Sequence, residues 1–429
     1  MSLRSVSNQP AISPGGKDSP VDSAAPSTPS ASGEDEIIVI AKEGDIVLHI
    51  EHDIGERQSA CRLRVSSRKL ADVSKYFARL LQPGRFGEGE RVDTELKSLR
   101  EKYPSIAEAP ATELPVISLQ DLGRISTVKS ISPLCTDMLY MLHGNDLAAT
   151  PPLTNLANLA IVADRFDALI AAAEYANRKK LIRTIDGKTT PKIDTNLTQE
   201  KVRQRLLVAV LFNYSPWIEK YSARLIIRGW VGNEVETTLP LWWDLPSRFE
   251  EELLCRREYM LDAVQSVQAH FLSLYSSRER QCKLGYDSSA QCDSFQLGEM
   301  IRFFMRIGTL KLQGVVYDAT EPPEPYSGDV YSLLDAMQQV PEYQIDKNHH
   351  HCGIRTRIIP LIDTLRESIS HIGICFEYWT TSWSQYAWME AKQPLLWRKQ
   401  NYRLKATSHE TLHANVRGLF MAAERDWSI

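Results

Sequence analysis

The side chains best suited to metal binding lie in two segments of the second half of the chain. One segment carries Cys282 and Cys292, and the other is the run His349-His-His-Cys352. Thiolates and imidazoles are the ligands that a structural zinc ion prefers, and four of them close a tetrahedral site. We therefore expect a structural zinc ion bound by Cys282, Cys292, Cys352 and one imidazole, that of His350 or of His349. Of these two histidines we name His350 as the ligand.

This zinc site has two alternatives. Nine residues separate Cys282 from Cys292, which is wider than the two to four residues of common zinc fingers. The same residues therefore also fit an exposed histidine run beside three unrelated thiols. A zinc-dependent enzyme is the other alternative, and it requires an open coordination position in a pocket lined by His349–His351.

Other signatures of catalysis are weak. A catalytic thiol needs a base and an electropositive setting. His351 and Cys352 are adjacent in the sequence, but adjacency does not place the imidazole where it can accept the proton of the thiol. The glycine-rich run Gly84-Arg-Phe-Gly-Glu-Gly89 lacks the Lys-Ser/Thr pair of a phosphate loop. We therefore expect no catalytic residue, and no cofactor other than the structural zinc, in a protein that is not an enzyme.

The composition indicates an ordinary soluble chain. Its 429 residues are 43% hydrophobic and 24% charged, which suits two or three domains at roughly 100–200 residues each. The net charge of −4 argues against direct nucleic-acid binding. No apolar run reaches the ~20 residues of a membrane span, and the N-terminal residues lack the apolar segment of a secretion signal. We expect an intracellular protein, cytoplasmic or nuclear, whose cysteines form no disulfides.

The predicted secondary structure differs between the segments of the chain. Residues 1–35 are rich in Ser and Pro, and we expect a disordered tail. The apolar patterning then predicts strands at 45–51 and 61–65, a helix at 68–81, a surface insertion with a short helix at 87–110, a third strand at 114–119, and helices at 126–142, 152–165 and 166–182.

This order of hairpin, helix, strand and helical cluster resembles a BTB/POZ domain, in the form common in filamentous fungi. The resemblance covers residues 37–185 and is carried by Asp45-Ile-Val-Leu-His-Ile, Leu63-Arg-Val-Ser-Ser-Arg-Lys-Leu70, Ser74-Lys-Tyr-Phe77, Phe86-Gly-Glu88, Leu139-Tyr-Met-Leu-His-Gly-Asn145 and Leu159-Ala-Ile-Val-Ala-Asp-Arg-Phe166. The chain departs from the animal-type pattern at Ser66, where such members usually have His. The resemblance implies an α+β module over residues 36–185, built from a small sheet and a helical cluster.

The resemblance also implies a function. BTB modules characteristically self-associate or bind other proteins, so a non-catalytic interaction protein or adaptor is expected, with a homodimer through the module. We expect Ile46, Leu48, Val73 and Phe77 to form the apolar surface that a second copy or a protein partner covers.

A second partner is implied by the segment Phe86-Gly-Glu88. In BTB proteins that recruit a cullin-class ubiquitin ligase scaffold, a hydrophobic-x-Glu element of this region contacts the cullin. The alternative function is therefore a substrate adaptor for such a ligase, with Phe86 and Glu88 in the contact. The other interpretation is a loop in which Phe86 packs on its own domain.

The rest of the chain is predicted to be a polar linker at 186–200 and a mainly α-helical C-terminal domain at 201–429. Apolar periodicity predicts helices at 199–217, 247–276, 295–312 and 355–369. Within 247–276, apolar residues recur every seven positions, and we favour packing within the domain over a coiled coil.

The aromatic residues near the C-terminus share one predicted helix face. Phe376, Trp379, Trp383 and Tyr386 follow helical spacing. Tryptophans dominate interface anchors, so Trp379 and Trp383 could form a second partner-binding surface. Alternatively, the same side chains complete the core of the helical domain.

Overall fold

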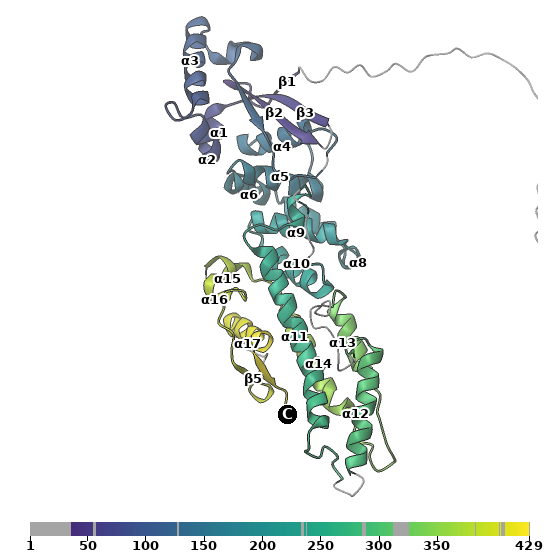
Figure 1. The fold of residues 1–429 in the computed structure, drawn as a ribbon. Coiled ribbons are helices and arrows are strands. Elements are labelled where there is room, and N and C mark those ends of the chain that lie inside the picture. The colour runs from purple at the N-terminus through teal and green to yellow at the C-terminus, as the bar shows by residue number, and fades with distance from the viewer. Residues whose placement is uncertain are drawn as a thin grey trace, which may run out of the picture.

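The structure is a computed structural model that describes residues 36–428 apart from 55–56, 127, 233–235, 237, 285–288, 312–325, 382, 403 and 405–407. The predicted tail at 1–35 lies outside the described residues. The fold is mixed α/β, with a small sheet near the N-terminus followed by a mainly helical remainder (Figure 1). No helix in the described part of the chain is both long and apolar enough to cross a membrane.

The N-terminal sheet contains the predicted hairpin and one unpredicted strand. Its order is β1-β3-β2-β4, with β1 at Ile37–Val39, β2 at Ile46–Ile54, β3 at Arg57–Val65 and β4 at Val116–Gln120. Strands β2 and β3 pair antiparallel, and β4 returns parallel to β2. The predicted third strand is confirmed as β4. Strand β1 was not predicted because three residues give too short a pattern.

Among the described residues, seven α-helices accompany this sheet: α1 (Ser67–Val73), α2 (Lys75–Leu80), α3 (Gly87–Lys102), α4 (Ser132–His143), α5 (Leu153–Arg165), α6 (Leu169–Arg178) and α7 (Leu181–Gly187). The single helix predicted at 68–81 is wrong, because the chain leaves helical geometry at Ser74. The Ser74 hydroxyl accepts from the Phe77 backbone N–H and donates to the Phe166 carbonyl, so it starts a second helix. The predicted insertion at 87–110 is mostly α3, a helix longer than expected.

The residues predicted to face a partner lie mainly in the core of this module. Ile46 and Leu48 are 0% exposed and Phe77 is 1% exposed, while Val73 is half-buried. Val47, between the two strand residues, is buried as well. Strand β2 is therefore covered on both faces by its own chain, and the prediction that Ile46, Leu48 and Phe77 form a docking surface is wrong.

The predicted linker at 186–200 is instead packed structure. It contains α8 (Pro191–Thr195) and leads into α9 (Gln199–Leu211) and α10 (Ser215–Arg228). The Trp217 indole N–H donates to Asp186, and the Tyr221 hydroxyl donates to Asp194. Helix α9 packs on α5, and one continuous core includes residues of both halves. The two predicted domains therefore share a core.

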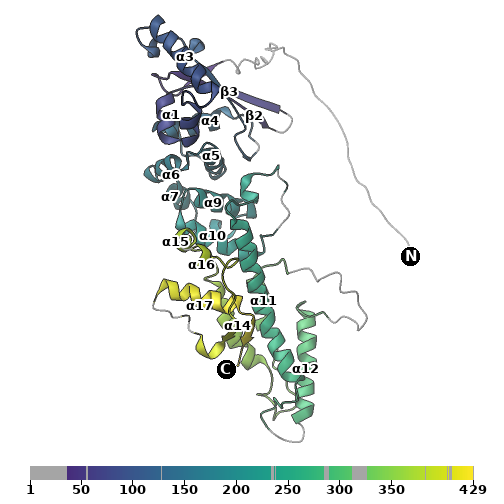
Figure 2. The ribbon, with the colours of Figure 1, turned by 60° about the vertical axis from the view of Figure 1, so that its left-hand side comes forward.

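The C-terminal half is built around one long helix. Helix α11 (Phe249–Ser276) runs down the molecule in Figures 1 and 2, and Figure 1 shows α12 to α14 on one side of it and α15 to α17 on the other. The bounds of these elements are α12 (Ser289–Arg306), α13 (Val330–Gln338), α14 (Arg355–Ile369), α15 (Phe376–Thr381), α16 (Trp383–Tyr386), β5 (Leu396–Arg398), α17 (His409–Met421) and β6 (Glu424–Asp426). The seven-residue repeat of α11 is buried against these neighbours, which confirms packing within the domain.

The aromatic segment is helical at Phe376–Thr381 (α15) and at Trp383–Tyr386 (α16), on either side of residue 382, which lies outside the described residues. Trp379 is 7% exposed and packs edge-to-face on Phe249 and on Trp383. Trp379 therefore belongs to the intramolecular packing, and its predicted role as a surface anchor is wrong. Trp383 is half-buried, with the Arg248 guanidinium over its ring.

Candidate metal centre

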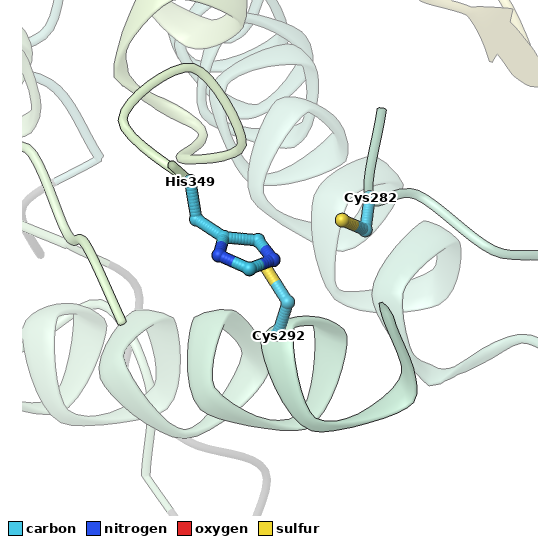
Figure 3. A group of neighbouring side chains, drawn as sticks. All are labelled: Cys282, Cys292 and His349. Atoms are coloured by element: carbon cyan, nitrogen blue, oxygen red, sulfur yellow. The ribbon is translucent and has the colours of Figure 1, made fainter. Parts of the chain in front are cut away.

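Three separate segments bring the predicted ligands together. Cys282 lies in the segment that follows α11, and Cys292 lies in the first turn of α12. His349 and Cys352 come from the turn between α13 and α14. Figure 3 shows the His349 ring directed at Cys292, with Cys282 beside them.

The separations between ligand atoms suit a tetrahedral metal ion. The Sγ atoms of Cys282 and Cys352 are 3.7 Å apart, and the ligand atoms of Cys282, Cys292 and His349 all lie within 4.8 Å of one another. Zinc–sulfur bonds of about 2.3 Å in a tetrahedron place two sulfurs about 3.8 Å apart. A disulfide needs about 2.05 Å, and these three cysteines are free. The separation of the Cys282 and Cys352 sulfurs, which also suits a hydrogen bond between two thiols, is close to that of two thiolates on one zinc ion.

His349 has the orientation of a metal ligand. The side chain is 2% exposed, and its Nδ1 lies 2.9 Å from Asp346 Oδ1. Because an ionised carboxylate only accepts hydrogen bonds, Nδ1 carries the proton, and in the neutral imidazole Nε2 keeps its lone pair. That Nε2 is buried and has no hydrogen-bond partner among the described residues. A carboxylate that orients an imidazole in this way is typical of zinc sites.

The predicted ligand His350 is wrong, and its alternative His349 occupies the position. His350 is exposed, its Nδ1 lies 3.3 Å from the Lys347 carbonyl, and its ring packs on His351. The Cys352 backbone N–H donates to the His349 carbonyl. This tight turn puts the first and fourth residues on one side, so His349 and Cys352 face the same point and His350 faces solvent.

The three sulfurs are arranged so that a cation is needed to ionise them together. Burial raises the pKa of the Cys292 thiol, and the neighbouring charges of Cys352 and Cys282 raise it further. Burial also raises the pKa of Cys352. Burial opposes ionisation of Cys282 too, but hydrogen bonds, first that from the Leu284 backbone N–H, lower its pKa overall. A bound divalent ion reverses the repulsion and deprotonates coordinating thiols.

The surroundings hold the site in place. The three cysteines form a small cluster of their own, with Leu284 packed against it. The Tyr275 hydroxyl donates to the Cys352 carbonyl, and Asp293 accepts from the Gln281 backbone N–H.

Three ligand atoms, those of Cys282, Cys292 and His349, form the compact group, and the Cys352 sulfur lies beside that of Cys282. With Cys352 as the fourth ligand, no coordination position would remain for a substrate, which is the pattern of structural zinc. The alternative of an enzyme site lined by His349–His351 is therefore not supported at this centre.

No protein-family model, no curated protein and no solved structure matches this chain. The interpretation of the centre therefore depends on its own geometry.

Two features were missed in the sequence. The orienting carboxylate, Asp346, lies three residues before His349, a spacing that is readable once a turn is assumed. A second ligand group, Cys375, His409 and His413, was also not predicted. Its signal is the pattern His-Glu-x-x-His that begins at His409.

Proposed function

We propose that this chain is a non-catalytic protein-interaction protein. A BTB-like module at residues 36–185 self-associates, and the zinc-stapled C-terminal half provides a second binding surface. One structural zinc ion, bound by Cys282, Cys292, His349 and Cys352, fastens the end of α11 to α12 and to the 346–352 turn.

The observation that carries the interaction is the edge strand β1. It is outermost in the sheet and pairs only with β3 among the described strands. Its Val39 is 48% exposed. An unpaired strand edge with an exposed apolar side chain is a template for a strand of a second copy. At the opposite edge, Arg91 donates to the Val116 carbonyl in β4, so that edge is partly blocked by its own chain.

Light scattering on the full chain after size exclusion tests self-association. We expect a mass of twice the 48.7 kDa chain, and a shift to the monomer mass for Val39→Lys, because a charge on an edge strand opposes pairing. Val116→Lys, at the opposite edge, is the matched control and keeps the dimer. A wild-type monomer at all concentrations contradicts the proposal, and so does a dimer that persists in Val39→Lys.

One observation favours a cullin-class ligase adaptor as the second candidate function. Phe86 is 49% exposed at the N-terminus of α3, and Glu88 is exposed in the first turn of the same helix. An exposed aromatic anchor beside a carboxylate suits a partner groove.

Binding of a purified cullin N-terminal region to the full chain tests this candidate. Phe86→Ala should weaken binding by at least tenfold, and Ile170→Ala, at another strongly exposed apolar residue, should not change it. Equal binding by the two variants, or no binding by the wild type, excludes this adaptor function.

A further inference from the structure

A second group of ligand atoms lies at the start of α17. The Nε2 atoms of His409 and His413 are 3.0 Å apart, and Cys375 Sγ lies within 4.8 Å of both imidazoles. Residues four apart share a helix face, and Ser408 fixes the start of the helix by accepting from the Thr411 backbone N–H. The Cys375 backbone N–H donates to the Tyr386 hydroxyl, which anchors the third ligand.

The spacing of the two histidines has a chemical meaning. In His-Glu-x-x-His on a helix, both imidazoles bind zinc and the glutamate stands beside the metal. Short motifs recur by chance, so the placement of a third ligand is the stronger argument. Cys375 supplies it from a segment distant in the sequence, and the described residues offer these three ligand atoms as one group.

A cavity adjoins this group. Its volume is about 130 Å³, and its walls include His413, Glu410, His371, Tyr378 and Arg256. A single water needs about 10–15 Å³ of space for its centre, so the cavity has room for several waters or a small ligand. We assign four residues to the centre described above, whereas this group has three ligands, one of which, His413, lines the cavity.

One nitrogen of a cationic side chain in the cavity wall has no hydrogen-bond partner among the described residues. Arg256 is 1% exposed and pairs through Nε with Glu252, while its Nη1 donates to the Ile372 and Gly373 carbonyls. Its Nη2 has no hydrogen-bond partner among the described residues. The guanidinium also lies over the Tyr386 and Trp388 rings, and Nη2 has the capacity to donate to a further acceptor in the cavity. The observation is independent of the histidines.

We propose that Cys375, His409 and His413 bind a second zinc ion whose fourth position opens into this cavity. That position takes water or a small oxygen-donor anion such as a carboxylate, and the unpartnered Nη2 of Arg256 donates to the same ligand. Three protein ligands with one exchangeable position distinguish this ion from the structural one. The Nε2 contact between the two histidines is then replaced by two bonds to the metal.

The test counts metal ions in the full chain. Elemental analysis after zinc loading and desalting should give two zinc ions per chain for the wild type and one for His409→Asn. His409 is exposed, so this change leaves the fold intact, which circular dichroism checks. His350→Asn, an exposed histidine outside both groups, should keep two. One ion in the wild type, or two in His409→Asn, overturns the proposal.

The open position has its own readout. Cobalt(II) replaces zinc, and its visible spectrum reports the ligands of the ion. Adding acetate should change the spectrum of the wild type and leave that of His409→Asn unchanged. Two bound ions with no response to acetate mean that the second site is closed, which overturns the open position. Cys282→Ser should lose the structural zinc ion and keep the second one, so the two variants retain different zinc ions.

Discussion

Two buried histidines, one in each half of the molecule, differ in whether the Nε2 atom has a hydrogen-bond partner. In the N-terminal module, His143 of α4 is 7% exposed. Its Nδ1 lies 2.8 Å from the Leu139 carbonyl, and its Nε2 accepts from the Ser66 backbone N–H. In the C-terminal half, His349 is buried to a similar degree, but its Nε2 has no partner among the described residues and faces cysteines.

The difference separates a core histidine from a ligand. Both ring nitrogens of His143 form hydrogen bonds with the backbone, and these bonds hold α4 against the start of α1, where Ser66 is the N-cap. In His349 one ring nitrogen is bonded to Asp346, and the other has no hydrogen-bond partner among the described residues. Burial alone therefore does not identify a metal ligand, whereas a buried, oriented and unpartnered nitrogen does.

Removing a sulfur beside His349 should have the largest effect. Cys292 is 0% exposed, and structural zinc in small peptides binds with about 10–16 kcal/mol. We expect Cys292→Ser to lose one zinc ion per chain and to lower the melting temperature strongly in calorimetry. Cys255→Ser, at a half-buried thiol in α11 that no metal group includes, should keep the full zinc content. Equal zinc content in Cys292→Ser and the wild type contradicts the comparison.

Removing the orienting carboxylate should have an intermediate effect. Loss of such a partner typically weakens metal binding 10–100-fold, which is about 1.4–2.7 kcal/mol. We expect this loss for Asp346→Asn, measured by competition with a zinc chelator of known affinity. Glu342→Gln removes an exposed acid from the same segment and should bind zinc like the wild type. If both variants bind alike, Asp346 does not orient a ligand.

Acid should test the other histidine and give the smallest effect. Burial lowers the pKa of His143, with Lys69 lowering it further against the opposing Leu139 carbonyl and Asp45. The unfolded chain then binds a proton more readily than the folded one below about pH 6.5. This contribution to stability is present above pH 6.5 and is lost as the pH falls toward the lowered value.

We therefore expect His143→Gln, whose amide can replace both hydrogen bonds, to flatten the decline of the melting temperature between about pH 6.5 and 5. His350→Gln, at an exposed histidine, serves as the control with an unchanged slope. If the melting temperatures of the two variants decline with pH at the same slope, the pKa of His143 does not differ between the folded and the unfolded chain.

Much of the fold was readable from the sequence because periodicity is a local signal. Strands β2 and β3, helix α5 and the long helix α11 all follow apolar patterns. The break at Ser74 was not readable, because it depends on a hydrogen bond to the distant Phe166 carbonyl. The buried state of Ile46 and Leu48 was also missed, since a strand covered on both faces has the same apolar residues as an interface strand.

The ligands divide in the same way. Three cysteines of the first centre were named from residue type alone, but the choice between His349 and His350 depends on a turn that spacing does not specify. For the second group, the spacing of His409 and His413 is visible in the sequence, but the pair was missed. The third member of the group, Cys375, was not readable, because only the folded chain brings α15 next to α17.

Zinc-edge X-ray absorption on the zinc-loaded full chain carrying His409→Asn tests the structural centre most directly, since this variant retains only that site. The arrangement of Cys282, Cys292, His349 and Cys352 predicts one zinc ion with three sulfurs at about 2.3 Å and one nitrogen at about 2.0–2.1 Å. A chain that retains no zinc, or a first shell of oxygen and nitrogen without sulfur, would contradict it.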